Sequence, residues 1–345
     1  MIKRDNLNIL KFEPLDSPKD LKALLPLSEA GSLRVIESRN NIQKVLDHKS
    51  NLFLVMVGPC SIHNPAEALE YARRLKKLSN EVCSKLILVM RVYFEKPRTT
   101  IGWKGLIYDP DLDGSCHMSK GLKIARKLLL DINELELSTA TEILGPVTAQ
   151  YIADIVSWTA IGARTTESQT HRQLASGLSM PVGFKNATNG NIKTAVEAIK
   201  AAIHKHVFLG VLEDGRSGIF HTTGNKYSHI ILRGGINEPN YGSEHIAYTR
   251  ELLKKNNLTP SIMVDCSHAN SDKKASRQSS VLNDIIAQRN NGEKSIVGVM
   301  IESNLHHGKQ VINNQSSLEH GISITDECVG WQETEDMIRE LYKSL

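Results

Sequence analysis

Short apolar runs rich in β-branched residues alternate with longer amphipathic runs along the chain from Leu52 onward. This alternation is typical of repeated strand–helix units that build a parallel sheet. The predicted strands are Leu52–Val57, Leu86–Val92, Glu134–Thr139, Trp158–Ala163, Pro181–Phe184, His229–Leu232, Ser261–Val264 and Ser295–Ile301. The pattern therefore predicts an α/β fold of the closed (β/α)8 type, a TIM barrel.

Two segments lie outside this pattern. Residues 1–45 contain prolines and short amphipathic stretches but no barrel-like alternation. We interpret them as an N-terminal extension with an oligomeric or regulatory role, followed by a catalytic barrel over residues 46–345. Before the sixth strand, two apolar runs flank Asp214-Gly215, and Asp-Gly is a strong hairpin-turn signal. We therefore expect an inserted β-hairpin at about 206–223.

Composition narrows the class of protein without naming a function. The chain has 345 residues, of which 40% are hydrophobic and 23% charged, as in an ordinary globular domain. Its net charge of +4 is spread without a basic block, so no nucleic-acid partner is indicated. No apolar run is long enough to span a membrane, and the first residues lack a signal-peptide core. Five cysteines without a CxxC pair favour reduced thiols, and we expect a cytoplasmic protein.

Candidate chemistry follows the predicted strands. In a TIM barrel the loops at the C-terminal ends of the strands carry the active site. Nearly every predicted strand is followed by a side chain that can hold an anion, a metal ion or a proton. These residues are Cys60, Arg91, Glu142, Arg164, Lys185, Arg233, His268 and Glu302. A single charged residue after a strand needs no function, because loops are exposed to water and are commonly polar. The convergence of all these side chains at one end of a barrel nevertheless predicts a functional site.

The cationic members of this set indicate the kind of substrate. Arg91, Arg164, Lys185 and Arg233 would face one mouth, and Lys96 and Arg98 follow on the next loop. Arginine suits bidentate recognition of carboxylate and phosphate, and lysine acts as a compact point charge. The cluster therefore predicts a substrate with several anionic groups, such as a phosphorylated carboxylic acid.

A second subset offers mixed metal ligands. Cys60, His268 and Glu302 provide sulfur, nitrogen and oxygen, and Asp326 can supply another oxygen. Such a set suits one divalent ion of Mn, Fe, Co or Zn better than Mg or Ca. The ligands are far apart in the sequence, so spacing alone leaves open that Cys60 is simply a small buried hydrophobic residue.

Longer strings carry a resemblance to a known family. The matching stretches are GPCSIH (58–63), YFEKPRTT (93–100), DPDLDGS (109–115), GARTTESQTHR (162–172), PVGFKN (181–186), HIILRGG (229–235) and DCSHANS (265–271). The chain resembles the class I 3-deoxy-D-arabino-heptulosonate 7-phosphate (DAHP) synthases, most closely the tyrosine-sensitive type. The resemblance implies a metal-dependent transferase that condenses phosphoenolpyruvate with erythrose 4-phosphate in the first step of the shikimate pathway of aromatic amino-acid biosynthesis.

The resemblance also implies residue roles. Cys60, His268, Glu302 and Asp326 resemble the metal ligands. Arg91, Glu142, Arg164, Lys185 and Arg233 resemble the phosphoenolpyruvate pocket, and Lys96, Arg98 and Thr99 resemble the erythrose 4-phosphate side. Lys96, Lys185, His268 and Cys60 are the expected catalytic residues, and we expect the neighbouring Arg91 and Arg98 to lower the pKa of Lys96. A related phosphoenolpyruvate-dependent sugar-acid synthase and a non-catalytic amino-acid-sensing barrel remain alternatives.

Regulation is the other expectation from the resemblance. Family members bind an aromatic amino acid, here expected to be tyrosine or phenylalanine, in a cavity away from the mouth. The corresponding residues are Gly145, Ala149, Gln150, Ser179, Phe208 and Gly210. Relatives commonly carry Asp in place of Gly145 and Pro in place of Ala149, so we expect weakened or lost inhibition. We also expect a homodimer or homotetramer.

Overall fold

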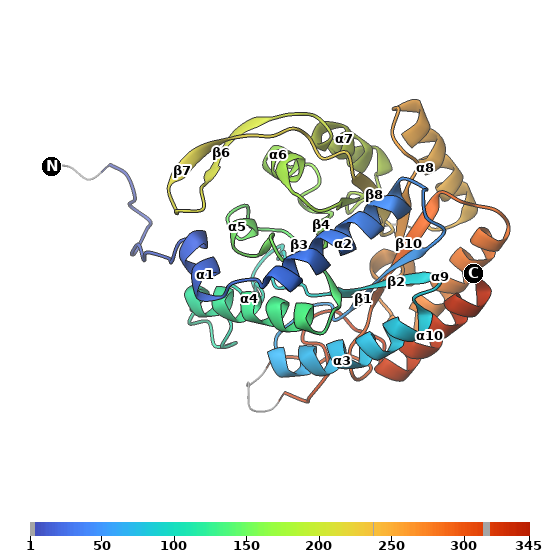
Figure 1. Ribbon diagram of the computed structural model, residues 1–345, viewed down its shortest axis with the longest axis horizontal. Coiled ribbons are helices and arrows are strands. Elements are labelled where there is room, and N and C mark those ends of the chain that lie inside the picture. The colour runs from blue at the N-terminus through green and yellow to red at the C-terminus, as the bar shows by residue number, and fades with distance from the viewer. Residues whose placement is uncertain (1–3, 237, 313–317) are drawn as a thin grey trace.

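A computed structural model describes residues 4–236, 238–312 and 318–345. Its centre is a closed barrel of eight parallel strands in the order β1-β10-β9-β8-β5-β4-β3-β2 (Figure 1). The strands are β1 Phe53–Gly58, β2 Leu86–Arg91, β3 Ser138–Glu142, β4 Trp158–Ile161, β5 Val182–Lys185, β8 Ser228–Leu232, β9 Ile262–Asp265 and β10 Ile296–Glu302. The predicted (β/α)8 barrel is confirmed.

Helices cover the outside of the barrel and its flanks. They are α1 Pro18–Leu24, α2 Glu29–Leu46, α3 Pro65–Val82, α4 Met118–Glu134, α5 Ala149–Ile152, α6 Gln169–Gly177, α7 Ile192–Ala202, α8 Ser243–Lys255, α9 Gln278–Asn290 and α10 Trp331–Ser344, with 3-10 turns η1 His268–Ser271 and η2 Ala275–Arg277. The start of α3 shows how the sequence sets a helix boundary. The side chain of Asn64 accepts from two backbone N–H groups, and Pro65 takes the first helical position, where no N–H is needed.

The third strand was placed wrongly by the sequence pattern. Glu134 to Leu137 alternate between polar and apolar side chains, as a half-buried strand does. In the structure α4 runs through Glu134, and Glu136 has a φ of 57°, which turns the chain before β3 begins at Ser138. Leu137 lies between α4 and β3, and its apolar side chain is buried there. The apolar residue that the pattern assigned to a strand therefore belongs to the turn after the helix.

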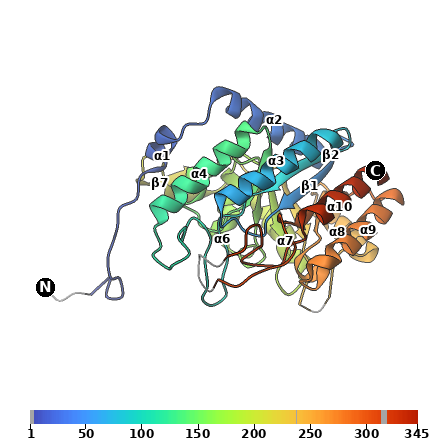
Figure 2. The same ribbon diagram turned by 90° about the horizontal axis from the view of Figure 1, so that it is seen from below.

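The barrel has two apolar layers and a closed bottom. Leu54 and Met56 of β1 point into the barrel, whereas Val55 and Val57 pack outward with the surrounding helices, as alternation along a strand requires. The interior layer also contains three residues of α2: Ile42, Val45 and Leu46. Figure 2 shows α2 on the opposite side of the molecule from the long loops. Helix α2 therefore seals the N-terminal end of the barrel and leaves the C-terminal end for the site.

The inserted hairpin is present and stands outside the barrel. Strands β6 Val207–Val211 and β7 Ser217–His221 form a separate antiparallel pair between β5 and β8. One face contains stacked Phe208 and Phe220, with ring centroids 5.6 Å apart. The turn contacts α1, because Lys19 N donates to Glu213 O over 2.7 Å and Lys22 pairs with the Glu213 carboxylate. In the part of the chain that the structure describes, no helix has the length and apolar character needed to cross a membrane.

Candidate active site

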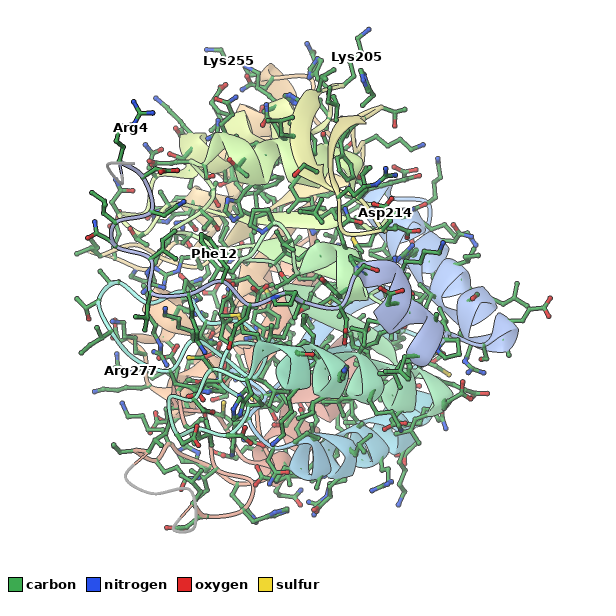
Figure 3. All side chains as sticks on the ribbon, turned by 90° about the vertical axis from the view of Figure 1, so that its left-hand side faces the viewer. Arg4, Phe12, Lys205, Asp214, Lys255 and Arg277 are labelled. Carbon is green, nitrogen blue, oxygen red and sulfur yellow. The ribbon has the colours of Figure 1, made fainter. Side chains whose placement is uncertain are left out.

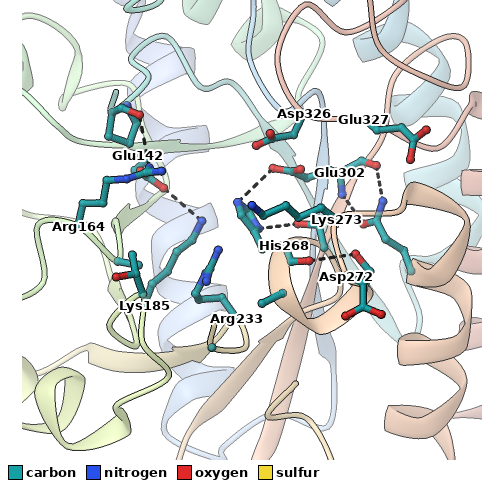
Figure 4. Close-up of a pocket in the computed structure, with 18 of the residues that line it drawn as sticks. Glu142, Arg164, Lys185, Arg233, His268, Asp272, Lys273, Glu302, Asp326 and Glu327 are labelled. Carbon is teal, nitrogen blue, oxygen red and sulfur yellow. Dashed lines mark hydrogen bonds and ion pairs between the residues drawn. The ribbon is translucent and has the colours of Figure 1, made fainter. Parts of the chain in front are cut away.

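The C-terminal ends of the barrel strands surround a cavity of about 530 Å³. Of the residues predicted from the sequence, Arg91, Lys96, Arg98, Glu142, Arg164, Lys185, Arg233, His268, Glu302 and Asp326 line it. Figure 4 shows Glu142, Arg164 and Lys185 on one side of this cavity and His268, Glu302 and Asp326 on the other. The structure therefore brings together side chains that are separated by more than two hundred residues in the sequence.

Three of the four predicted metal ligands form a compact cluster. One ligand atom from each of Cys60, Glu302 and Asp326 lies within 4.8 Å of the others. Cys60 is fully buried behind the cavity wall, and its thiol lies 3.5 Å from Asp326 Oδ2. Burial, followed by the negative charge of Glu302, raises the pKa of the Cys60 thiol to about 11. A cation placed among these groups would offset the repulsion that keeps the thiol protonated.

His268, the fourth predicted ligand, borders this cluster with one ring nitrogen available. Its Nδ1 lies 2.9 Å from Asp265 Oδ2, and its Nε2 lies 3.9 Å from Glu302 Oε1. A ligating histidine commonly has its other ring nitrogen held by a carboxylate, which fixes the orientation of the ring. Asp265 is fully buried, and although burial opposes ionisation, His268 and Lys185 hold the pKa of its carboxyl well below the usual range.

Arg91 connects the cluster of Cys60, Glu302 and Asp326 to the side of the cavity that carries the other cationic side chains. Its Nη2 donates to Glu302 Oε1 over 2.9 Å, and both side chains are buried. Within the described chain, Arg91 Nε and Nη1 have no hydrogen-bond partner, and neither does the hydroxyl of buried Tyr93. The Arg91 guanidinium lies 4.1 Å from the Tyr93 ring centroid, and both residues line the cavity. The sequence did not predict Tyr93 as a residue of this cavity, because a tyrosine that follows a buried strand is usually part of the hydrophobic core.

Lys185 is the second buried cation of the pocket. Its Nζ lies 3.2 Å from Glu142 Oε2 and 3.6 Å from Asp265 Oδ2. Burial alone would lower the pKa of Lys185, but these carboxylates raise it overall. Burial likewise opposes ionisation of Glu142, yet Lys185 and Lys96 keep its pKa below the ordinary value. Both groups are therefore charged at neutral pH.

Two further arginines face the same space. Arg164 is exposed and makes one long contact, from Nη1 to Pro97 O at 3.4 Å. The half-buried Arg233 is held through its backbone, because its N–H donates to Asn186 Oδ1 over 2.8 Å. Among the residues described, its guanidinium has no hydrogen-bond partner. These side chains are free to bind an anion in the cavity.

Lys96 departs from the expected electrostatics. Its Nζ donates to Cys60 O over 3.0 Å and to Cys60 Sγ over 3.1 Å. The prediction that neighbouring arginines lower its pKa is wrong. Burial does act in that direction, but the interactions with Cys60, Glu302 and Asp326 outweigh it and raise the pKa. The sequence could not reveal this, because all three lie far from Lys96 in the chain.

The outer part of the same loop is more open. Arg98 lines the cavity and donates from Nε to Trp103 O over 2.8 Å. Thr99 is exposed and is not among the lining residues. Of the residues expected on the erythrose 4-phosphate side, the structure thus brings Lys96 and Arg98 into the cavity and leaves Thr99 at its edge.

The residues expected to bind an effector lie near the hairpin and α5. Gly145 N donates to Glu95 Oε1 over 3.0 Å, and an added Cβ would lie 2.9 Å from that oxygen. A Cβ on Gly210 would lie 2.7 Å from the Phe220 ring. Ala149 is buried, Gln150 and Phe208 are half-buried, and Ser179 is exposed. At Gly210, the space that a missing side chain leaves is therefore filled by Phe220.

Comparison with known proteins identifies the family. Residues 34–339 match the model of the DAHP synthetase I family. The chain belongs to this family. It is 49% identical over 342 residues to the Tyr-sensitive phospho-2-dehydro-3-deoxyheptonate aldolase of Salmonella typhimurium, covering 99% of this chain and 96% of the relative. It is 51% identical over 337 residues to the Phe-sensitive enzyme of Escherichia coli, covering 98% and 96%.

A solved structure shows the same architecture. The phospho-2-dehydro-3-deoxyheptonate aldolase of Francisella tularensis superposes with a TM-score of 0.96 at 47% identity, covering 98% of each chain. The membership confirms the interpretation of the chain as a class I DAHP synthase, a transferase that condenses phosphoenolpyruvate with erythrose 4-phosphate in aromatic amino-acid biosynthesis. The full-length matches to Tyr-sensitive relatives confirm the predicted resemblance to that type, and the names of the Tyr-sensitive and Phe-sensitive relatives agree with feedback regulation by an aromatic amino acid in this family.

Proposed function

We propose that this cavity is the condensation site, with the phosphoenolpyruvate carboxylate against Arg91 and Lys185 and its phosphate between Arg164 and Arg233. The observation that carries this placement is the buried Arg91 guanidinium with two unpartnered N–H nitrogens beside the cavity. Leaving buried donors without acceptors is costly, and a bound carboxylate would satisfy them. Glu142 would keep Lys185 in place through its 3.2 Å ion pair.

We further propose that Cys60, His268, Glu302 and Asp326 hold one divalent ion of Mn, Fe, Co or Zn. The donor set fits, because three ligand atoms cluster within 4.8 Å and His268 Nε2 lies on the border of the cluster. A thiolate and an imidazole together favour these ions over Mg or Ca. When bound, such an ion supplies a Lewis acid for the aldehyde oxygen of the second substrate.

In this proposal the protein's own residues position the reactants and transfer protons. C3 of phosphoenolpyruvate bonds to the aldehyde carbon of erythrose 4-phosphate, and the aldehyde oxygen takes a proton from the Lys96 ammonium. Water then adds as hydroxide at C2 of the former phosphoenolpyruvate, and its proton returns to the Lys96 amine. The resulting hemiketal phosphate breaks its C–O bond to the phosphorus-bound oxygen, its hydroxyl proton leaves with the phosphate as HPO4²⁻, and C2 becomes the ketone; Arg164 and Arg233 stabilise the charge of the leaving phosphate. The raised pKa of Lys96 keeps the proton available before the reaction.

Phosphate release tests the reaction and the substrate together. Purified protein receives phosphoenolpyruvate and erythrose 4-phosphate with Mn, or with EDTA, and a parallel sample receives arabinose 5-phosphate in place of erythrose 4-phosphate. We expect phosphate release with erythrose 4-phosphate and Mn that EDTA abolishes. Phosphate release only in the sample that contains phosphoenolpyruvate and arabinose 5-phosphate would instead indicate the related sugar-acid synthase reaction.

For regulation, we propose that inhibition by tyrosine or phenylalanine is weakened. The argument is the close contact of Gly145 with Glu95, which leaves no room for the aspartate common in relatives, together with the filled space at Gly210. A titration of tyrosine and phenylalanine against initial rate tests it. Half-maximal inhibition at micromolar concentrations of either amino acid would contradict the proposal.

We also propose that the protein is a cytoplasmic homodimer or homotetramer. Apolar side chains are exposed on the N-terminal segment, including Leu10 and Phe12, and on the outer face of the hairpin, including Leu209. Figure 3 shows this segment, with Phe12 labelled, as an extended strand of chain leading into α1. Such surface favours burial against another copy, and light scattering of the purified protein would give the mass. All five cysteines are free, which suits a reducing compartment.

A further inference from the structure

The end of β10 is held by an amide side chain. Gln278, the first residue of α9, is fully buried and lines the cavity. Its Nε2 donates to Glu302 O over 2.9 Å, and its Oε1 accepts from Glu302 N over 2.8 Å. Val329 N is a second donor to Glu302 O, over 3.1 Å. A buried amide that bonds to both backbone polar groups of one residue fixes the position of that residue. Gln278 therefore fixes the backbone from which the Glu302 carboxylate reaches Cys60 and Asp326.

The turn before α9 is also held by Glu327, which directly follows Asp326 in the chain. The backbone N of Ala275 donates to Glu327 Oε2 over 2.7 Å. Glu327 Oε1 lies farther from its neighbour, 4.0 Å from Nε2 of the exposed His307. Figure 4 shows Asp326 and Glu327 on the same side of the cavity as Glu302. Residues 275–278, here called the connecting turn, are thus bonded to Glu302 at one end and to the residue after Asp326 at the other.

We propose that the connecting turn sets the separation of the Glu302 and Asp326 carboxylates, with Gln278 and Glu327 as its positioning residues. The two carboxylates belong to separate segments, one at the end of β10 and one before α10. Ligands that already lie at the right separation bind an ion more tightly, because less ordering is needed on binding. The connecting turn acts on metal affinity and not on substrate recognition. The inference rests on the proposed metal ligation by Glu302 and Asp326.

The affinity of the full-length enzyme for Mn measures this role. Each protein is equilibrated with a series of free Mn²⁺ concentrations held constant by a chelator, and the metal bound per chain is measured by mass spectrometry. Gln278→Met replaces the amide with an apolar side chain of similar length, and Glu327→Ala removes the acceptor for Ala275 N. We expect each substitution to raise the Kd for Mn about tenfold, as is typical for residues that orient metal ligands.

Two further variants separate positioning from a general loss of structure or of charge. Gln288 lies on the same helix and also donates to a backbone oxygen, that of Tyr241 over 2.8 Å, but it does not line the cavity. Gln288→Met should therefore keep the Kd of the unsubstituted enzyme. Glu327→Gln keeps an oxygen that can accept from Ala275 N but removes the negative charge, so its Kd should lie close to that of the unsubstituted enzyme.

The double variant tests whether the two contacts act as one connection. Loss of either end breaks the connection, so Gln278→Met combined with Glu327→Ala should raise the Kd about as much as the stronger single substitution. The proposal would be overturned by multiplied effects, by an unchanged Kd in both single variants, or by an equal loss in Gln288→Met. An equal loss in Glu327→Gln and Glu327→Ala would also overturn it, because charge and not position would then be responsible.

Two other results have a distinct meaning. If Gln278→Met does not fold, the comparison of Glu327→Ala with Glu327→Gln decides the question, because Glu327 is only half-buried. Failure of the proposed metal site itself would appear as absence of Mn binding by the unsubstituted enzyme.

Discussion

Arg91 and Glu302 form a fully buried ion pair, 2.9 Å from Nη2 to Oε1, that joins the two halves of the site. Glu302 also belongs to the metal-ligand cluster, and Arg91 presents two unpartnered N–H groups beside the anion pocket. One carboxylate therefore fixes the orientation of the guanidinium while taking part in the metal site. In the proposed function, this pair would link binding of the metal to binding of phosphoenolpyruvate.

Arg91→Lys should separate charge from geometry at this pair. Lysine keeps the positive charge but lacks the planar fork that donates to Glu302 and to a carboxylate at once. We expect kcat/KM for phosphoenolpyruvate to fall by about tenfold or more, as for loss of a charged hydrogen bond, while metal content measured by mass spectrometry stays at one ion per chain. Unchanged kcat/KM would argue against carboxylate recognition by Arg91.

Replacement of a proposed metal ligand should lower the metal content, which Arg91→Lys should leave unchanged. Asp326→Asn and Cys60→Ser each weaken a donor of the cluster, so metal retained after dialysis should fall by about tenfold or more, and activity should return partly at high Mn. Cys83→Ser is the control, because Cys83 is exposed at the C-terminal end of α3 and does not line the cavity. If Cys60→Ser and Cys83→Ser retained metal equally, Cys60 would not be a ligand.

Lys96→Met tests proton donation. Lys96 donates to both the carbonyl oxygen and the sulfur of Cys60, so the ammonium sits beside the cluster with its pKa raised. Loss of a general acid typically lowers kcat by about 10²–10⁴-fold. We expect this loss with little change in the KM for phosphoenolpyruvate, measured at saturating Mn. A change in KM alone would assign Lys96 to binding.

The sequence predicted the strand ends better than it predicted the electrostatics there. Arg91, Lys185 and Glu302 were found because a parallel barrel brings the C-terminal ends of its strands together, whatever lies between them. The raised pKa of Lys96 was missed because Cys60, Glu302 and Asp326 approach it only in the folded chain. Helix α2 was read as part of an extension, since nothing local shows that Ile42 and Val45 complete the barrel interior.

Gly145→Asp should damage the enzyme. The new Cβ would lie 2.9 Å from Glu95 Oε1 and 3.0 Å from the Tyr108 hydroxyl, and it would bring a second carboxylate next to buried Glu95. We expect a loss of about 1–3 kcal/mol in the free energy of unfolding, and a lower kcat because Glu95 precedes Lys96. Val147→Asp places the same charge on an exposed neighbour and should leave both quantities unchanged. Equal stability of the two variants would remove the steric argument.

His229 should make the barrel sensitive to acid. Burial lowers its pKa to about 4, from an ordinary value near 6.5, and the neutral ring accepts from Trp158 Nε1 over 3.1 Å. Because the folded state has the lower pKa, the unfolded state binds more protons as the pH falls from about 6.5 to 4. The stabilisation present above pH 6.5 is therefore lost across this range, by about 3 kcal/mol for a shift of this size.

Urea unfolding of His229→Gln at pH 7.5 and pH 5 measures this contribution. Glutamine keeps an acceptor for Trp158 but does not titrate, so the variant should be less stable at pH 7.5 and should lose less stability on acidification than the unsubstituted protein. His204→Gln, at an exposed position after α7, is the control and should keep the original pH dependence. If His229→Gln also kept the original pH dependence of stability, another buried group would govern the response to acid. His63 would then be the next residue to replace, because burial also lowers its pKa to about 4.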